Sequence, residues 1–180
     1  NQRFPEQMSK PMTNPKVELH IAAHGVITLE LEQDKAPKSV ANFLSYVSKG
    51  HYDNTVFHRV IADFMVQGGG FAVGMKQKPT HGEIENEANN GLKNLHYTVA
   101  MARTNQPHSA SSQFFINVSD NDFLDHSAPT SSGWGYAVFA KVIGGTGIVD
   151  KIAGCKTGRK GLHEDVPLVD VIIEKAVLLA

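Results

Sequence analysis

Apolar and polar residues alternate over residues 17–31, near the start of the chain. The alternation runs through residues 17–21 and again through 27–31, and it breaks once, at Ala22-Ala23-His24-Gly25. Because successive side chains of a strand point to opposite faces, each stretch predicts a strand with one apolar face. The glycine in the break is typical of a tight turn, so we predict a β-hairpin.

From residue 36 the apolar positions follow the spacing of a helix. Four of them recur three or four residues apart: Val40, Phe43, Leu44 and Val47. Pro37 suits the first helical turn, and Gly50 suits the end of the helix. A second, shorter helix is predicted over residues 147–152, after the glycine-rich turn 144–147.

Six further segments are short and rich in β-branched or aromatic residues, as strands are. They are residues 55–61, 64–68, 97–101, 113–118, 136–142 and 169–176. Many short strands, glycine-rich links and only two helical patterns favour a closed antiparallel barrel over alternating strands and helices. The predicted fold class is mainly β. The long loops, about residues 72–95 and 102–112, are candidates for substrate contact.

Composition supports one globular domain. The 180 residues are 41% hydrophobic and 19% charged, which argues against disorder. A formal net charge of −1 gives no electrostatic basis for binding nucleic acid or an anionic membrane. No apolar run approaches the ~20 residues that span a bilayer. Cys155 is the single cysteine, so no internal disulfide is expected.

The first fifteen residues differ from the rest. They are polar and contain three prolines, so we expect residues 1–15 to be a flexible N-terminal arm, a tag remnant or a processed end. Residues 16–180 should form the folded domain. We expect a monomer in the cytoplasm, with a processed periplasmic form as the alternative.

The segment over residues 57–71, FHRVIADFMVQGGGF, carries the strongest chemical signal. It places polar side chains among large apolar ones. In an extended chain, Arg59, Met65 and Gln67 would share one face, with Phe64 at a nearby bend. Apolar walls with a few aimed donors are the usual composition of a ligand site. The alternative is a core strand with one arginine that reaches solvent.

Three later segments extend this signal: SSQFFINV at 111–118, NDFLD at 121–125 and GYAVFAKV at 135–142. With FHRVI and FMVQGGGF, they give the chain a close resemblance to the cyclophilins, the peptidyl-prolyl cis-trans isomerases, and most of all to their bacterial branch. The resemblance covers nearly all of residues 16–179, with the motifs in order. It implies an eight-stranded closed barrel with a helix over each end.

The resemblance also implies roles for individual residues. Arg59 matches the catalytic arginine of the family. The pocket that receives the proline ring matches Phe64, Met65, Phe115 and Leu124. Gln67 should support Arg59 or bond the substrate backbone, and Gln113 should do the latter. The remaining substrate contacts expected from the motifs are His58, Ala102, Arg103, Phe123 and Tyr136, and for His58 a structural role is the alternative.

The implied reaction is a rotation about a single peptide bond. Rotation of an X–Pro bond meets a barrier of ~18–20 kcal/mol and breaks no bond between heavy atoms. It therefore needs no nucleophile, metal or cofactor, and we expect none. His20 and His24 are four residues apart, but they lie on a strand and its turn, so a metal site is not expected there. A non-catalytic proline-peptide binding module, or a holdase, is the alternative function on the same fold.

Two departures from the family pattern bear on ligands. Phe123 stands where many eukaryotic relatives have a tryptophan, so cyclosporin should bind weakly, because an indole donor is missing. Tyr136 stands where those relatives have a histidine, as is common in the bacterial branch. Ala62-Asp63 also replaces a Pro-Gly pair in the turn that follows the FHRVI segment.

Overall fold

The computed structural model describes residues 13–179, so residues 1–12 of the predicted arm lie outside the described residues. Asn14 and Pro15, the last part of that arm, contact strand β2 (Gly25–Leu31). The main-chain N–H of Leu31 donates to the Pro15 carbonyl over 2.8 Å, and the Asn14 amide donates to Glu30. Two helices and two short 3-10 helices accompany the strands: α2 (Pro37–Ser48), α3 (Thr146–Ala153), η1 (Ala88–Asn90) and η2 (Asp122–Leu124).

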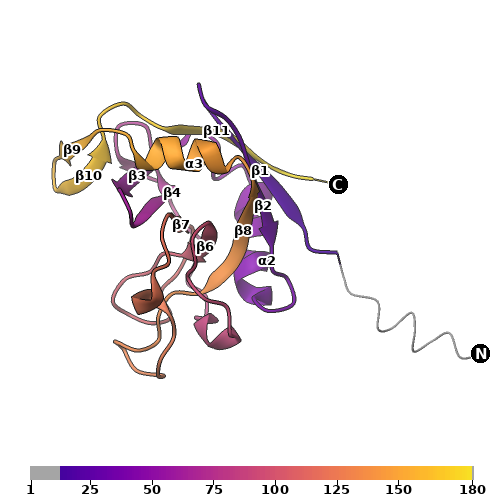
Figure 1. Ribbon diagram of the computed structural model, residues 1–180. Helices are drawn as coiled ribbons and strands as arrows, with labels where there is room; N and C mark the ends of the chain where they lie inside the picture. The colour runs from indigo at the N-terminus through magenta and orange to yellow at the C-terminus, as the bar shows by residue number, and fades with distance from the viewer. Residues whose placement is uncertain (1–12, 180) are drawn as a thin grey trace, which may run out of the picture.

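Most of the strands belong to one antiparallel sheet, which closes on itself. In chain order the strands are β1 (Lys16–Ile21), β2 (Gly25–Leu31), β3 (Thr55–Ile61), β4 (Met65–Ala72), β5 (Lys76–Gln77), β6 (Thr98–Met101), β7 (Phe114–Asn117), β8 (Val138–Gly144), β9 (Thr157–Lys160), β10 (His163–Pro167) and β11 (Ile172–Leu178). The sheet order is β3-β11-β1-β2-β8-β6-β7-β4-β5, and β3 also pairs with β4. Without the edge strand β5, these strands form a closed eight-stranded barrel, which confirms the predicted fold (Figure 1).

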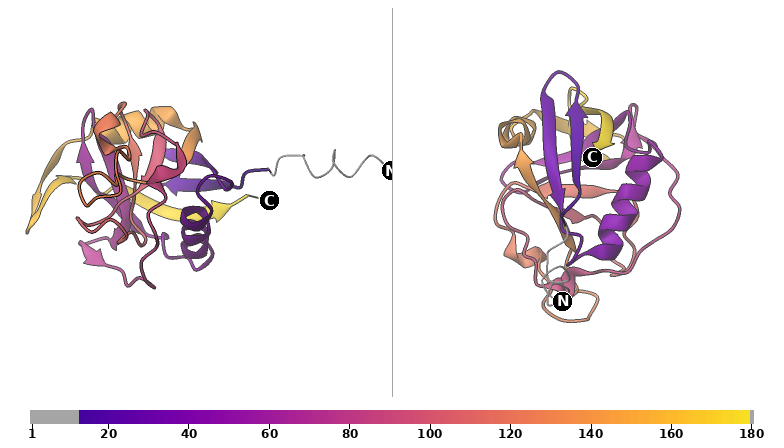
Figure 2. Two further views of the ribbon diagram at one scale, coloured as in Figure 1. Left: turned by 90° about the horizontal axis from the view of Figure 1, so that it is seen from below. Right: turned by 90° about the vertical axis from the view of Figure 1, so that its right-hand side faces the viewer.

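The alternating residues of the predicted hairpin fill the barrel. Strands β1 and β2 pair with Leu19 opposite Ile27, and both side chains are fully buried. Helices α2 and α3 cover opposite sides of the barrel, as the right-hand view of Figure 2 shows. The Phe43 ring of α2 packs among barrel side chains, with its centroid 5.5 Å from that of Phe114, and Ile152 of α3 is buried in the same core.

The segment that carried the chemical signal forms a hairpin of β3 and β4. Its turn places Asp63 at φ 62°, a left-handed conformation that aspartate tolerates better than most residues, which explains why a glycine is not required here. Strand pairing sets Arg59 opposite Gln67 and Ile61 opposite Met65. The predicted common face of Arg59, Met65 and Gln67 is therefore confirmed, and it is the outer face of the barrel.

A second two-stranded sheet was not predicted. Strands β9 and β10 form a hairpin beside β3 and β4, outside the barrel (Figure 1). Their sequences, TGRK and HEDVP, are mostly polar and have no apolar alternation, so no strand pattern is visible in them. Val166 and Pro167 at the end of β10 are buried, and they fix this hairpin to the rest of the fold.

Candidate active site

A pocket of about 130 Å³ opens on the outer face of the barrel, beside the β3–β4 hairpin. Its lining comes from five separate parts of the chain: the hairpin, the residues after β6, strand β7, helix η2 and the residues before β8. The lining residues are Arg59, Phe64, Met65, Gln67, Ala102, Arg103, Phe115, Leu124 and Tyr136. All nine were predicted as site residues, and the fold brings them together.

The apolar wall of this pocket is a small hydrophobic cluster, separate from the core inside the barrel. Met65, Phe115 and Leu124 are its buried members nearest the opening. The ring of Tyr136 stands edge-on to that of Phe115, with centroids 5.7 Å apart. Phe115 faces outward because it pairs with Gln67 across the β4–β7 ladder, whereas its neighbour Phe114 points into the barrel core.

Arg59 is the exposed cation at the rim of the pocket. Its Nη1 donates a hydrogen bond to Oε1 of Gln67 over 3.4 Å, and Nε2 of Gln67 donates to Oε1 of Gln113 over 2.9 Å. These glutamines form a relay that orients the guanidinium. A guanidinium carries five N–H donors in a planar fork, so this one long bond leaves donors for a ligand.

Arg103, the second cation of the lining, is held in place by hydrogen bonds to two main-chain carbonyls. Its Nε donates to the Gly135 carbonyl over 2.9 Å and its Nη1 donates to the Thr104 carbonyl over 2.9 Å. The guanidinium carbon lies 4.6 Å from the centroid of the Tyr136 ring, a cation–π contact. Arg103 therefore stiffens the wall that Tyr136 forms, whereas Arg59 is held by one long bond.

A polar pocket of about 280 Å³ adjoins the apolar one and shares Gln67, Ala102 and Arg103 with it. Gln113 lines this second pocket and not the first. The other lining residues come mostly from the two long loops that were predicted to contact substrate: Gln77, Glu83, Thr104, Ser109 and Ser111. An apolar pocket for one side chain beside a polar groove suits an extended peptide.

Three buried asparagines behind the pocket hold its walls, and the sequence analysis missed them. The side-chain amide of Asn94 donates to the carbonyls of Leu124 and Tyr136 over 3.3 and 3.2 Å. That of Asn121 donates to the carbonyl of Phe64 over 2.9 Å. Asn117 joins the two, since it donates to Asn94 over 3.0 Å and accepts from Asn121 over 2.8 Å.

The position of Asn117 inside the apolar strand FFIN was the available signal for this network. A side-chain amide with no access to solvent requires partners, because an unpaired buried amide is costly.

Two predicted substrate contacts, Phe123 and His58, line neither the apolar pocket nor the polar one. Phe123 is 71% exposed, and its ring centroid lies 5.7 Å from that of Phe64, at the outer rim. His58 is only 6% exposed and packs against Phe71, with centroids 4.6 Å apart. The pairing of β3 with β4 shifts between Phe57 and Arg59, so His58 is the extra residue of a bulge. Its burial agrees with the structural role that was the alternative.

The buried imidazole of His58 should make the protein sensitive to acid. Its Nδ1 has no hydrogen-bond partner, and burial, with smaller effects of His163 and Arg59, lowers its pKa to about 4. As pH falls below 6.5, the unfolded chain binds a proton that the folded protein still excludes. The free energy of unfolding should therefore be highest above pH 6.5 and fall by up to about 3 kcal/mol as pH approaches 4.

Urea unfolding of the protein and of His58→Gln at pH 7, 5.5 and 4.5 measures this effect. The variant should lose less stability over that range than the parent does. The stability of the variant should still depend on pH to some extent, because burial also lowers the pKa of His51. If the free energy of unfolding falls equally with pH in the two proteins, His58 does not exclude the proton.

Taken together, the fold and the site define a class. A closed antiparallel barrel carries, on its outer face, an apolar pocket with an exposed arginine at its rim and a polar groove beside it. Within residues 13–179 no cluster of three or more His, Cys, Asp or Glu side chains is arranged to hold a metal ion. The helices in that range are all too short or too polar to cross a membrane. This is the arrangement of a barrel that binds an extended peptide.

Comparison with known proteins identifies the family. The family described as "Cyclophilin type peptidyl-prolyl cis-trans isomerase/CLD" matches residues 16–178. Peptidyl-prolyl cis-trans isomerase cyp18 of Streptomyces antibioticus is 60% identical over 163 residues, which cover 91% of this chain and 98% of the relative. Peptidyl-prolyl cis-trans isomerase B of Escherichia coli (strain K12) is 60% identical over 155 residues, or 86% of this chain and 94% of the relative.

Solved structures agree with the sequence comparison. A crystal structure of a cyclophilin type peptidyl-prolyl cis-trans isomerase of Cryptosporidium parvum matches with a TM-score of 0.75 at 25% identity, and it covers 93% of this chain and 98% of that one. A second structure of that protein, in the presence of the dipeptide Ala-Pro, matches with a TM-score of 0.74. The chain belongs to the cyclophilin-type peptidyl-prolyl cis-trans isomerases and is of the bacterial type. The predicted family, enzyme class and peptidyl-prolyl isomerase function are thereby confirmed.

Proposed function

We propose that this isomerase accelerates rotation about X–Pro bonds through a hydrogen bond from Arg59 to the prolyl nitrogen. The observation that carries the proposal is the position of an exposed guanidinium at the rim of an apolar pocket, held by one long bond to Gln67. In the planar amide the nitrogen lone pair is delocalised into the carbonyl. It becomes an acceptor only as the bond twists, so the donor stabilises the transition state more than the ground state.

The rest of the site positions the substrate. The proline ring enters the cluster of Met65, Phe115 and Leu124, where burial of apolar area supplies binding energy. The residues before the proline lie along the polar pocket, where Gln113 and the main chain of Ala102 and Arg103 bond the peptide backbone. The Cryptosporidium structure determined in the presence of the dipeptide Ala-Pro supports a proline-containing peptide as the ligand.

The substrates under this proposal are proline-containing unfolded or flexible polypeptides, with recognition mostly of main chain and proline ring. Contact with the main chain makes the enzyme tolerant of the residues around proline. We expect a monomer that acts in the cytoplasm. The single cysteine supports this compartment, since the described fold needs no disulfide.

A protease-coupled assay with a proline tetrapeptide tests the proposal directly. The protease cleaves only the trans isomer, so the rate of the slow phase reports isomerisation. We expect the rate constant of the slow phase to rise in proportion to enzyme concentration. A slow phase at the uncatalysed rate, with binding of the peptide intact, would favour the non-catalytic binding module or holdase instead.

The glutamine relay predicts an effect of Gly70, which lines neither pocket of the site. A Cβ at this position would lie 2.5 Å from Cγ and 2.6 Å from Nε2 of Gln113. Gly70→Ala should therefore displace Gln113 from Gln67 and loosen Arg59. Loss of one such bond, worth ~1 kcal/mol, should lower kcat/KM about fivefold.

Two further variants separate this effect from a general loss of structure. In a Gln113→Ala background there is no side chain to displace, so Gly70→Ala should add nothing to the loss. Gly147→Ala is the matched control, because a Cβ there meets nothing within 4 Å. An undiminished effect of Gly70→Ala in the Gln113→Ala background would contradict the relay.

The drug cyclosporin should bind weakly, and Phe123→Trp should tighten it. The exposed ring of Phe123 stands at the pocket rim beside Phe64, where an indole would add apolar area and an N–H donor. One added bond and the extra burial should lower Kd by about one to two decades. A calorimetric titration of both proteins measures the change, and equal Kd values would refute this account of the rim.

A further inference from the structure

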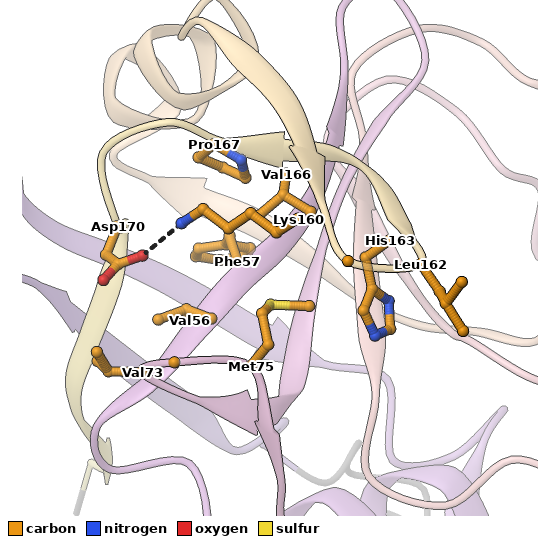
Figure 3. A pocket seen from close by; sticks show the side chains of 12 residues that line it. Val56, Phe57, Val73, Met75, Lys160, Leu162, His163, Val166, Pro167 and Asp170 are labelled. Carbon is orange, nitrogen blue, oxygen red and sulfur yellow. Dashed lines mark hydrogen bonds and ion pairs between the residues drawn. The ribbon is translucent and has the colours of Figure 1, made fainter.

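A third pocket, of about 610 Å³, lies under the β9–β10 hairpin (Figure 3). We call it the distal pocket, because it lies away from the polar groove and from the apolar pocket beside Arg59, which we call the proline pocket. Its lining is mainly apolar and comes from four segments: strand β3, the turn between β4 and β5, the hairpin, and the link between β10 and β11. The apolar lining residues are Val56, Phe57, Val73, Met75, Leu162, Val166 and Pro167. Its volume lies within the range of ligand sites.

The opening of this pocket exposes apolar side chains to solvent. Leu162, at the tip of the hairpin, is 92% exposed, and Val73, on the β4–β5 turn, is 45% exposed. Figure 3 shows Met75 between Val73 and Leu162, with Val56 deeper in the pocket lining and only 3% exposed. Exposed apolar side chains that surround an apolar hollow mark a surface that binds a partner.

The charged groups of the pocket limit what the partner can be. Lys160 and Asp170 lie at one side and pair with each other over 3.4 Å, so neither presents an uncompensated charge (Figure 3). A charged small molecule would find little to bind it. An apolar side chain would bury its surface against the floor, and the exposed Lys160–Asp170 pair could exchange its bond for bonds to a peptide main chain.

This pocket lies on the same face of β3 as the proline pocket. Phe57 and Val60 point into the barrel core, and the bulge at His58 lies between them, so Val56 and Arg59 both face outward. Val56 of one site and Arg59 of the other are three residues apart on β3, which is at most about 10 Å at ~3.3 Å per residue. An extended peptide bound at Arg59 needs only roughly three to six residues to reach the distal pocket.

Aromatic rings pack against one another between the two sites. The ring of His58, next to Arg59, packs on Phe71 at 4.6 Å, and Phe71 packs edge-on against His163 at 5.2 Å. His163 itself lines the distal pocket. His58 and Phe71 are 6% and 9% exposed, so these rings support the surface between the two sites from beneath.

We propose that the pocket under the β9–β10 hairpin is a distal subsite, which binds an apolar side chain of the same polypeptide whose proline occupies the active site. The inference rests on the proposed function, because it places the proline at Arg59. It extends that function from recognition of one proline to recognition of a proline with an apolar residue at a set distance along the chain. Unfolded chains carry such residues, and a subsite of this kind favours them over folded, polar segments.

A scan of one leucine along a model peptide tests the proposal. The parent peptide has a central Ala-Pro and otherwise polar residues, and leucine replaces serine at one position at a time, from three to eight residues on either side of the proline. Titration calorimetry with the full chain measures Kd. At the position that reaches the pocket, leucine should lower Kd about tenfold relative to the serine parent.

Surface variants test whether the gain in affinity of the leucine peptide comes from the distal pocket. Val73→Asp and Leu162→Asp place a carboxylate at the opening, and each should bring the leucine peptide to within about twofold of the serine parent measured with the same variant. Ile143→Asp is the matched control, because Ile143 is also 45% exposed and lies on β8. That variant should keep the full leucine gain.

The possible failures are distinct from one another. A tetrapeptide that is not isomerised at all would overturn the proposed function. Normal turnover of the tetrapeptide with no gain at any leucine position would overturn the distal subsite alone. A leucine peptide that still binds more tightly than its serine parent in Val73→Asp and Leu162→Asp would also overturn the distal subsite. The same holds if no leucine position lowers Kd and the protein self-associates in a way that Leu162→Asp abolishes, since a second copy would then be the occupant.

Discussion

Replacing Arg59 with alanine should remove most of the isomerase activity and leave the fold intact. Removal of one preorganised transition-state donor typically lowers kcat by about 10²–10³-fold, and we expect a loss of this size in kcat/KM. The side chain is exposed and bonds only to the flexible side chain of Gln67 among the described residues, so thermal unfolding should hardly change. The protease-coupled tetrapeptide assay and a thermal melt measure the two effects.

Two further substitutions sharpen this test. Arg59→Lys keeps the charge and loses the planar fork, so it should also lose much of the activity. Lys141→Ala removes an exposed cation from β8 and should keep wild-type turnover, which controls for net charge. Wild-type kcat/KM in Arg59→Ala would show that the guanidinium does not act on the prolyl nitrogen, and the mechanism proposed for this enzyme would be wrong.

Asn117→Ala should cause the largest loss of stability of any substitution near the site. The Asn117 amide is fully buried, and it connects Asn94 to Asn121. Truncation leaves an acceptor on Asn94 and a donor on Asn121 unpaired and opens a small cavity. We expect a loss of about 3 kcal/mol in the free energy of unfolding.

Urea unfolding measures this loss, with Asn89→Ala as the control. Asn89 is exposed, so its truncation should change stability by no more than about 0.5 kcal/mol. The pocket should also respond, because Asn121 positions the main chain of Phe64. KM for the tetrapeptide should therefore rise in the Asn117→Ala variant under conditions in which it is folded. A stability loss below about 1 kcal/mol would mean that water replaces the missing amide.

The neighbours of Arg59 show how far a linear pattern can predict a site. The common face of Arg59, Met65 and Gln67 followed from alternation. It continues across the turn at Asp63 because residues 59–61 pair with residues 65–67 without a register shift. The same rule did not decide between two roles for His58. A bulge adds one residue to a strand and turns its side chain elsewhere, and whether a bulge forms depends on the partner strand.

The asparagine network and the β9–β10 hairpin were not predicted, for related reasons. Asn94, Asn117 and Asn121 lie in different segments, and their bonds form only when the chain has closed around them. The hairpin has no apolar period, since only Val166 and Pro167 at its end are buried. Its position, and with it the distal pocket, depends on packing against Val56 from another part of the chain.

The sequence by itself determined the barrel and the two helices, because alternation and helical spacing are local. Its motif segments, by their resemblance to the cyclophilins, also gave the family and the nine residues that line the apolar pocket beside Arg59. Only the tertiary structure decided that His58 is buried, that asparagines hold the pocket walls, and that the hairpin creates a pocket on the same face as Arg59. Each of these depends on contacts between segments far apart in the chain, and such contacts leave no period in the sequence.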